Sequence, residues 1–127
     1  MAASARRLDK RYLMAVPVPF LDRRGRELDG SEVQRWVALA QQELTECFGG
    51  ATALPAPGTN IVGGKILYEA GQVLVVSACD SREEFLAHRD RIEAFVARMG
   101  EDLDQDAVFV LAFDSDSFLI ELEEGGS

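Results

Sequence analysis

Two helix-start signals constrain the fold of this chain more than any other feature. The sequences S-x-x-Q at 31–34 and S-x-x-E at 81–84 are capping boxes, in which paired side chains satisfy the free amide groups of a first helical turn. Each box opens an apolar stripe at helical spacing, and each stripe stops at a glycine, Gly49 or Gly100, as helices commonly do. The stripes consist of Val33, Trp36, Val37, Ala40, Leu44, Cys47 and Phe48, and of Phe85, His88, Ile92, Phe95 and Met99.

β-Strands are predicted on both sides of each helix. Residues 11–16 form the first, and Pro17 and Pro19 follow it without amide donors, which suits a strand end or an edge strand and not a central one. The nearly continuous apolar run at 73–78 is typical of a central strand buried on both faces. Two more strands are predicted after the second helix, a buried one at 107–113 and a short final one at 118–122.

Two turns compete to close the hairpin that is predicted between residues 59 and 79. Gly63–Gly64 is a two-residue turn of the type that hairpins favour, and the turn from Glu69 to Gln72 is the alternative. In the first case Gly71 marks a bulge within one long strand. These residues alone leave the choice open.

The element order β-α-β-β-α-β predicts an α+β fold. It is typical of a ferredoxin-like sandwich with two helices on one face of an antiparallel sheet, and an extra C-terminal strand can be added to it. We expect residues 1–10 to be a flexible N-terminal tail, residues 11–122 to be a single ferredoxin-like domain, and residues 123–127 to be a disordered tail.

The charge of the chain limits its partners. The 127 residues have a net charge of −9, with seven basic and four acidic side chains in 1–29 but six and eighteen in 30–127. Nucleic-acid binding by an acidic protein needs a local basic patch, and a bilayer span needs about 20 apolar residues. We therefore expect no nucleic acid and no membrane as partner. The N-terminal apolar run is broken by prolines, unlike a secretory signal, and two cysteines are too few for a disulfide scaffold, so we expect a cytoplasmic protein.

Three side chains are candidates for acid–base catalysis: Glu69, Tyr68 and His88. Tyr68 and Glu69 are strand neighbours and face opposite sides of a sheet, where a glutamate on an open face is most simply solvated. His88 lies on the apolar stripe of the second helix, and a helix-flank histidine bonded to backbone or solvent is the simpler interpretation. The sequence therefore favours a protein that is not an enzyme.

A ligand site is predicted between the open sheet face and the loop "ATALPAPG" at 51–58, with Thr52, Asn60 and Glu69 as candidates. The loop lacks both phosphate-binding glycine patterns and follows a helix, so a helix cap with a connector explains its glycines. A lone histidine excludes a multi-histidine metal site, and the acids near the last strand lack the calcium-loop spacing. We expect no metal and no cofactor, and a solvated acidic rim formed by Glu101, Asp102, Asp104, Asp106, Asp114 and Asp116.

The segment "FGGAT", followed by a Pro/Gly loop and a strand with "YE", resembles a family of short uncharacterised proteins from bacteria, archaea and phages, some of them lipoproteins. The family pattern is F-G-G-x-T, a Gly-x-Trp strand, a glycine turn, a strand glutamate and a G-Q-x-x-V-like segment. This chain has Asn60 where the tryptophan would fall, and it lacks the lipoprotein signal. The resemblance implies no established activity, but it favours the Gly63–Gly64 turn and places Glu69 in mid-strand. The matching positions are Phe48, Gly49, Gly50, Thr52, Gly58, Gly64, Glu69, Gln105 and Val108.

The leading functional prediction is a small cytoplasmic binding or regulatory domain that acts as a homodimer. A sheet covered on one face leaves edges and a face that a second copy commonly buries. One alternative is a cofactor-independent enzyme with a small pocket in a dimeric ferredoxin-like barrel. Another is an acidic inhibitor or antitoxin-like protein-binding partner.

Overall fold

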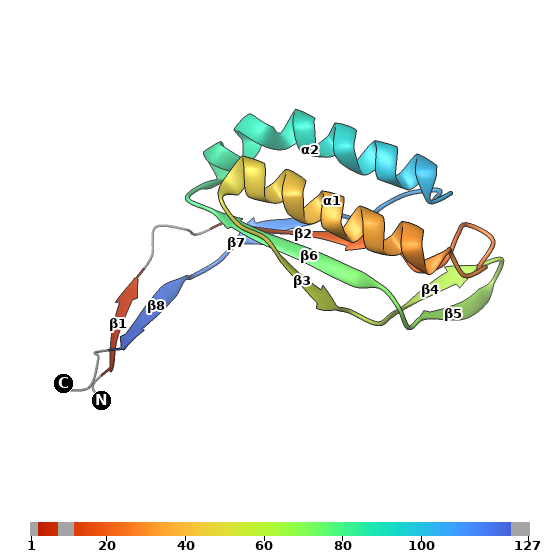
Figure 1. The fold of residues 1–127 in the computed structure, drawn as a ribbon, viewed down its shortest axis with the longest axis horizontal. Helices are drawn as coiled ribbons and strands as arrows, with labels where there is room; N and C mark the ends of the chain where they lie inside the picture. The colour runs from red at the N-terminus through yellow and green to blue at the C-terminus, as the bar shows by residue number, and fades with distance from the viewer. Residues whose placement is uncertain (1–2, 8–11, 123–127) are drawn as a thin grey trace.

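The computed structural model describes residues 3–7 and 12–122 and shows an α+β architecture (Figure 1). Two helices lie on one face of a four-stranded antiparallel sheet, and two smaller pairs of strands lie at opposite ends of it. The predicted α+β class and the placement of both helices on one face are confirmed. The helices are α1 (Gly30–Phe48) and α2 (Arg82–Asp102). The strands are β1 (Ala3–Arg7), β2 (Tyr12–Val18), β3 (Thr52–Pro55), β4 (Gly58–Val62), β5 (Lys65–Glu69), β6 (Val73–Cys79), β7 (Leu111–Asp114) and β8 (Phe118–Leu122).

The main sheet has the strand order β3-β6-β2-β7, with every pair antiparallel. The predicted pairing of the first strand with the run at 73–78 is confirmed, because Val16 lies opposite Val75. Of the two positions expected for the prolines, an edge strand is wrong, because β2 lies between β6 and β7, and a strand end is confirmed, because β2 ends at Val18, between Pro17 and Pro19. However, β7 pairs only with Tyr12–Ala15, so β2 is locally an edge from Pro17 onward and no partner strand needs the missing amide donors.

The N-cap of α1 differs from the prediction. Asp29 is the N-cap, and its Oδ1 accepts the amide of Ser31 at 2.8 Å. An aspartate competes well with a serine at this position, and here it begins the helix before the expected S-x-x-Q box. The other two caps are confirmed: Ser81 Oγ accepts the amide of Glu84 at 3.1 Å, and Gly49 ends α1 with φ of 92°.

The C-terminus of α2 also differs from the prediction, because the helix passes Gly100 and ends at Asp102. Gly100 is buried, and a Cβ placed on it would lie 3.2 Å from Val108 Cγ2. The glycine therefore serves a close approach between α2 and the chain that follows it. The left-handed residue beyond the helix is Asp104, with φ of 53°.

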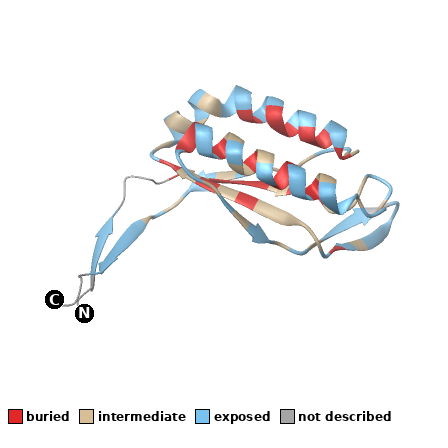
Figure 2. Cartoon of the chain, in the orientation of Figure 1, coloured by how far each residue is buried: buried red, intermediate tan, exposed pale blue. Residues whose placement is uncertain are grey.

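The hydrophobic core lies between the helices and the sheet (Figure 2). Leu44 and Met99 come from the two helices and meet Val16 and Val75 of the central strands, and all four are almost fully buried. The apolar stripes predicted for both helices supply most of the remaining core, although His88 and Phe85 are only half-buried.

The opposite face of the sheet is apolar and uncovered. We call this surface the open face. Since residues opposite each other in register share a face, it consists of Leu13, Ala15 and Pro17 of β2, Leu74, Val76 and Ala78 of β6, Thr52 and Leu54 of β3, and Leu111 and Phe113 of β7. The prediction of a buried strand at 107–113 is wrong: β7 begins at Leu111, and Leu111 and Phe113 are 43% and 47% exposed. The run at 73–78 is central, but it is covered by helices on one face only.

Two further strand pairs complete the structure. The turn at Gly63–Gly64 closes the β4–β5 hairpin, so the first of the two predicted alternatives is confirmed. Gly71 is not a bulge, because β5 ends before it and β6 belongs to a different sheet. Residues 3–7, expected in the N-terminal tail, form β1 and pair with β8, so the C-terminal strand does not extend the main sheet. The tail expected at 123–127 lies outside the described residues.

Candidate functional site

Glu69 is the most unusual side chain of the structure, because it is a carboxylate that is only 9% exposed. It is the last residue of β5, so the mid-strand position that we expected is wrong. Its Oε1 accepts the backbone amides of Phe20 at 3.3 Å and Leu21 at 3.1 Å. A buried carboxylate needs such donors to offset the loss of water. Glu69 therefore fastens the segment after β2 to the β4–β5 hairpin.

The turn after Glu69 is shaped to hold Phe20. A Cβ placed on Gly71 would lie 2.4 Å from Phe20 Cδ2, so the aromatic ring rests directly on the glycine backbone. The same ring belongs to one of the two residues whose amides Glu69 binds. The packing and the hydrogen bonds thus fix the same segment.

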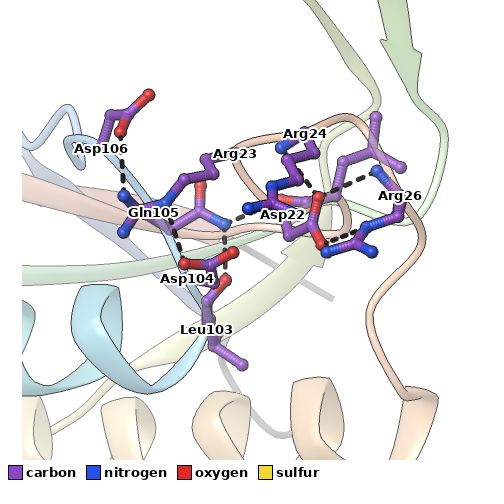
Figure 3. A network of polar contacts seen from close by, with 9 residues as sticks. Asp22, Arg23, Arg24, Arg26, Leu103, Asp104, Gln105 and Asp106 are labelled. Atoms are coloured by element: carbon purple, nitrogen blue, oxygen red, sulfur yellow. Dashed lines mark hydrogen bonds and ion pairs between the residues drawn. The ribbon is translucent and has the colours of Figure 1, made fainter.

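Gln105 holds this segment from the end of α2. Its Nε2 donates to the carbonyl of Leu21 at 2.7 Å and to that of Leu103 at 2.9 Å, while its backbone amide donates to Gly100 at 2.8 Å. Arg23 adds ion pairs with Asp104 at 2.8 Å and Asp106 at 3.6 Å (Figure 3). The loop after β2 is therefore held from two sides, by Glu69 through backbone amides and by Gln105 through a backbone carbonyl.

A tight turn follows in the same loop. Asp22 Oδ1 accepts the amides of Arg26 at 3.0 Å and Arg24 at 2.9 Å, and Gly25 takes a positive φ of 80° (Figure 3). The Arg26 amide, with the Arg24 amide and the Arg26 guanidinium, lowers the pKa of Asp22 despite some desolvation. This turn gives a rigid wall beside Glu69.

Glu69 lies in a cleft at the end of the sheet, where β2 has lost its partner strand. The cleft has a volume of about 220 Å³ and continues into a hollow of about 520 Å³ that shares five of its lining residues. The shared residues are Asn60, Glu69, Gln105, Ala107 and Phe109. The smaller cleft is completed by Pro17, Pro19, Thr59, Gln72 and Val108. Phe109 is 76% exposed, so its ring is available to a ligand.

The chemistry of the cleft is that of a receptor for a donor-rich or positively charged group. Within the described residues, no arginine or lysine forms an ion pair with Glu69, and its Oε2 has no hydrogen-bond partner. An ionised carboxylate only accepts hydrogen bonds. The prolines and the Phe109 ring supply apolar surface beside it, and aromatic faces attract cations.

The structure brings two predicted ligand residues together and separates the others. Asn60 and Glu69 line the same cleft. Thr52 lies on β3 at another hollow, beside Leu13 and Val76 of the open face, and not in the cleft at Glu69. Tyr68 is 63% exposed on the hairpin and does not line the cleft.

His88 does not line this cleft, and its ring contacts residues of the two helices. Its Nδ1 lies 3.0 Å from the carbonyl of Glu84, and its ring meets Phe48 edge-on, with the ring centroids 5.2 Å apart. The three acid–base candidates are therefore not brought together, and only Glu69 lies in a cleft with free space.

Sequence reasoning missed Gln72 and Phe109 as cleft residues, and it noted Gln105 only as a match to the family pattern. Phe109 and Phe113 stand at alternate positions with Leu111 in a strand-like run, which is a signal that one face of it is apolar and outward. Gln105 follows a helix end and carries no local signal, because its role depends on the carbonyl of Leu21 far along the sequence.

Four of the six acidic residues expected as a rim form ion pairs with three different arginines. Asp102 pairs with Arg35 at 3.4 Å and accepts the Trp36 indole N–H at 2.6 Å, and Asp116 pairs with Arg7 at 3.3 Å. The described residues contain no group of three or more acidic, histidine or cysteine side chains placed to hold a metal ion. No helix within the described ranges is both long and apolar enough to cross a lipid bilayer.

A second depression of about 530 Å³ lies between α2 and the strand β7. It is lined mainly by apolar side chains such as Phe85, Ile92 and Val110. One of its two arginines, Arg89, already pairs with Glu93 at 2.7 Å. Unlike the cleft at Glu69, this groove is not lined by a buried carboxylate.

Comparison with known proteins gives a similar fold and no family. No family model matches the chain, and no curated protein matches it. A phage SAM lyase in complex with S-methyl-5′-thioadenosine aligns with a TM-score of 0.57 and 14% identity over 93% of this chain and 94% of that chain. A phage SAM lyase in the apo state aligns with a TM-score of 0.55 and 16% identity over 94% of this chain and 95% of that chain. CutA from Synechococcus elongatus aligns with a TM-score of 0.49 and 13% identity over 90% of this chain and 85% of that chain. At these identities the likeness to the lyase concerns the fold alone.

Proposed function

We propose that the protein is a small-molecule-binding domain of ferredoxin-like fold that acts as a homo-oligomer, with the ligand held in the cleft at Glu69. The strand order β3-β6-β2-β7 with two helices on one face supports this fold assignment. Two buried, free cysteines, Cys47 and Cys79, are compatible with a reducing compartment such as the cytoplasm.

The observation that carries the proposal is the state of the Glu69 carboxylate. One oxygen accepts two backbone amides, while the other has no partner among the described residues, and the residue as a whole is only 9% exposed. An ionised carboxylate oxygen accepts hydrogen bonds, so a ligand that donates hydrogen bonds or carries a positive charge can bind to this one. Phe109 and Pro19 suit an aromatic or apolar part of the same ligand.

Self-association is supported by the open face. Its side chains are uncharged, and Leu54, Leu111 and Phe113 are each about two-fifths exposed or more. Exposed apolar patches of this kind mark interaction sites. Pro17 belongs both to the open face and to the wall of the cleft, so a second copy on this face would lie next to the ligand. A dimer is the simplest closed assembly.

Two probes that differ in charge test the ligand class. S-adenosylmethionine joins a sulfonium cation to a nucleoside, whereas S-methyl-5′-thioadenosine keeps the nucleoside without that charge. Calorimetric titration should show tighter binding of the cation. Glu69→Gln should weaken binding of the cation about tenfold or more, because it removes a charged hydrogen-bond acceptor. Glu27→Gln removes an exposed carboxylate of the adjoining loop and should change nothing.

The binding proposal fails if neither probe binds, or if Glu69→Gln and Glu27→Gln bind both probes as the wild type does. Equal affinity for the two probes, lost together in Glu69→Gln, would keep the site and assign it to a neutral nucleoside.

A second candidate function is a cofactor-independent enzyme that cleaves S-adenosylmethionine. The favouring observation is that a phage SAM lyase shares the fold over almost the whole chain, and that the cleft offers one carboxylate, Glu69, beside free space. Incubation with S-adenosylmethionine followed by chromatography should then show S-methyl-5′-thioadenosine, in an amount that Glu69→Gln reduces. Binding without this product would leave a binding domain.

A further inference from the structure

The ribbon formed by β1 and β8 has two chemically different faces. Phe118, Ile120 and Leu122 share one face with Ala5 and Arg7, because these residues lie opposite each other in register. The other face carries Ser4, Arg6, Leu119 and Glu121, and Arg6 pairs with Glu121 at 3.1 Å. The ribbon is therefore amphipathic, and its apolar side has a definite direction.

The apolar side of the ribbon is not covered within one chain. Phe118, Ile120 and Leu122 are 65%, 51% and 63% exposed. The ribbon extends away from the sheet (Figures 1 and 2), and its strands pack on each other and on no other helix or strand to any extent within the described residues. A two-stranded ribbon is marginally stable by itself in water. A further surface that covers its apolar side would stabilise it.

The open face of the sheet likewise has no covering layer among the described residues. It is a flat apolar surface without charged side chains, and β6 carries apolar residues on both of its faces although helices cover only one. The ribbon of the same chain extends beyond the end of the sheet and does not pack on this face (Figure 1). A second copy of the chain supplies one ribbon for this open face and one open face for this ribbon.

We propose that the apolar face of the β1–β8 ribbon packs on the open face of a second copy, and that the two copies exchange ribbons. This inference rests on the self-association proposed above and names the surfaces that form it. Reciprocal exchange uses one ribbon and one open face from each chain, so the assembly closes. The open face is uncharged, and Arg7, the charged residue on the apolar face of the ribbon, is paired with Asp116, so the contact does not place like charges of two chains of net charge −9 together.

The mass of the full chain and of four variants in solution tests the exchange. The wild type should have at least twice the 13.9 kDa of one chain. The ribbon variant, Phe118→Ser with Ile120→Ser, should have a dissociation constant at least about tenfold higher, because two apolar groups buried in the contact are lost. The open-face variants Leu111→Ser and Phe113→Ser should do the same. Leu119→Ser makes the same change on the polar face of the ribbon and should behave as the wild type.

A mixing experiment separates ribbon exchange from other modes of association. The ribbon variant keeps an intact open face, and Phe113→Ser keeps an intact ribbon. Mixing the two should restore dimers that neither forms alone, because one ribbon–face contact is again complete. If two open faces pair directly, every mixed pair contains one altered face and mixing restores nothing.

The outcomes are distinguishable. Restoration of dimers by mixing supports the exchange. Dimers lost in Phe113→Ser but kept in the ribbon variant overturn the exchange and leave self-association intact. A wild-type monomer at all concentrations overturns both. Circular dichroism shows whether each variant is folded, and a variant that unfolds is replaced by Leu111→Ser or by Ile120→Ser alone.

Discussion

Glu69 and Gln105 hold the same residue, Leu21, by its two backbone polar groups. Oε1 of Glu69 accepts the Leu21 amide at 3.1 Å, and Nε2 of Gln105 donates to the Leu21 carbonyl at 2.7 Å. The first side chain comes from a hairpin and the second from the end of a helix. The loop after β2 is thus clamped between two parts of the fold, and the cleft keeps its shape without a ligand.

Replacement of Gln105 by leucine should destabilise the protein by about 1–3 kcal/mol. The substitution leaves the Leu21 and Leu103 carbonyls without their donor in a half-buried place. Urea denaturation measures this change. Gln34→Leu, on the exposed side of α1, is the matched control and should change the free energy of unfolding by less than about 0.5 kcal/mol. Equal stability of the two variants would contradict the clamp.

Gly71→Ala should cost about 1–3 kcal/mol, because the added methyl group would lie 2.4 Å from the Phe20 ring. Gly50→Ala is the control, since nothing lies within 4 Å of a Cβ at that position. Thermal unfolding followed by circular dichroism compares the two. The packing of Phe20 on the glycine is refuted if Gly71→Ala melts with the wild type.

Ser81→Ala should destabilise the protein by about 1 kcal/mol, because Ser81 is the N-cap of α2. Ser31→Ala should have a smaller effect, since the backbone amide of Ser31, which the substitution keeps, is the group bound by Asp29. Chemical denaturation of both variants gives the difference. The reverse order of stability would restore the capping box at 31–34 that the sequence predicts.

The two cysteines should be inert in the folded protein. Burial raises the pKa of Cys47 and of Cys79 above the ordinary value of 9.0, so less of the nucleophilic thiolate is present at a given pH. Because the folded-state pKa is raised, this contribution to stability is complete below about pH 9 and decreases as the pH rises further. Alkylation with iodoacetamide should be slow until urea is added. Rapid alkylation of either thiol at neutral pH in the folded protein would contradict this.

Much of the main fold was predictable because its signals are local. The capping box at 81–84 and the apolar stripes gave both helices, and the run at 73–78 gave the central strand. Local signals failed where another part of the chain decides. Ala3–Arg7 has an arginine-rich sequence and becomes a strand because it pairs with β8. The position of Gly100 in the sequence is typical of a helix end, but the helix continues through it, and the glycine is needed for its close approach to Val108.

The candidate site was predictable only in part. Asn60 and Glu69 were named as candidates for a ligand site between the open sheet face and the loop at 51–58. Their partners are backbone groups of Phe20 and Leu21, which no side-chain motif reveals. Tyr68 and His88 were named for their chemistry, and the fold places neither of them in the cleft.

Nuclear magnetic resonance of backbone amides tests the central claim most directly, because the amides of Phe20 and Leu21 report on Glu69 itself. On addition of S-adenosylmethionine, the largest shift changes should fall on these two amides and on Asn60 and Phe109, and they should be absent in Glu69→Gln. Shift changes that cluster in the groove between α2 and β7, or no changes at saturating probe, would contradict a binding site at Glu69.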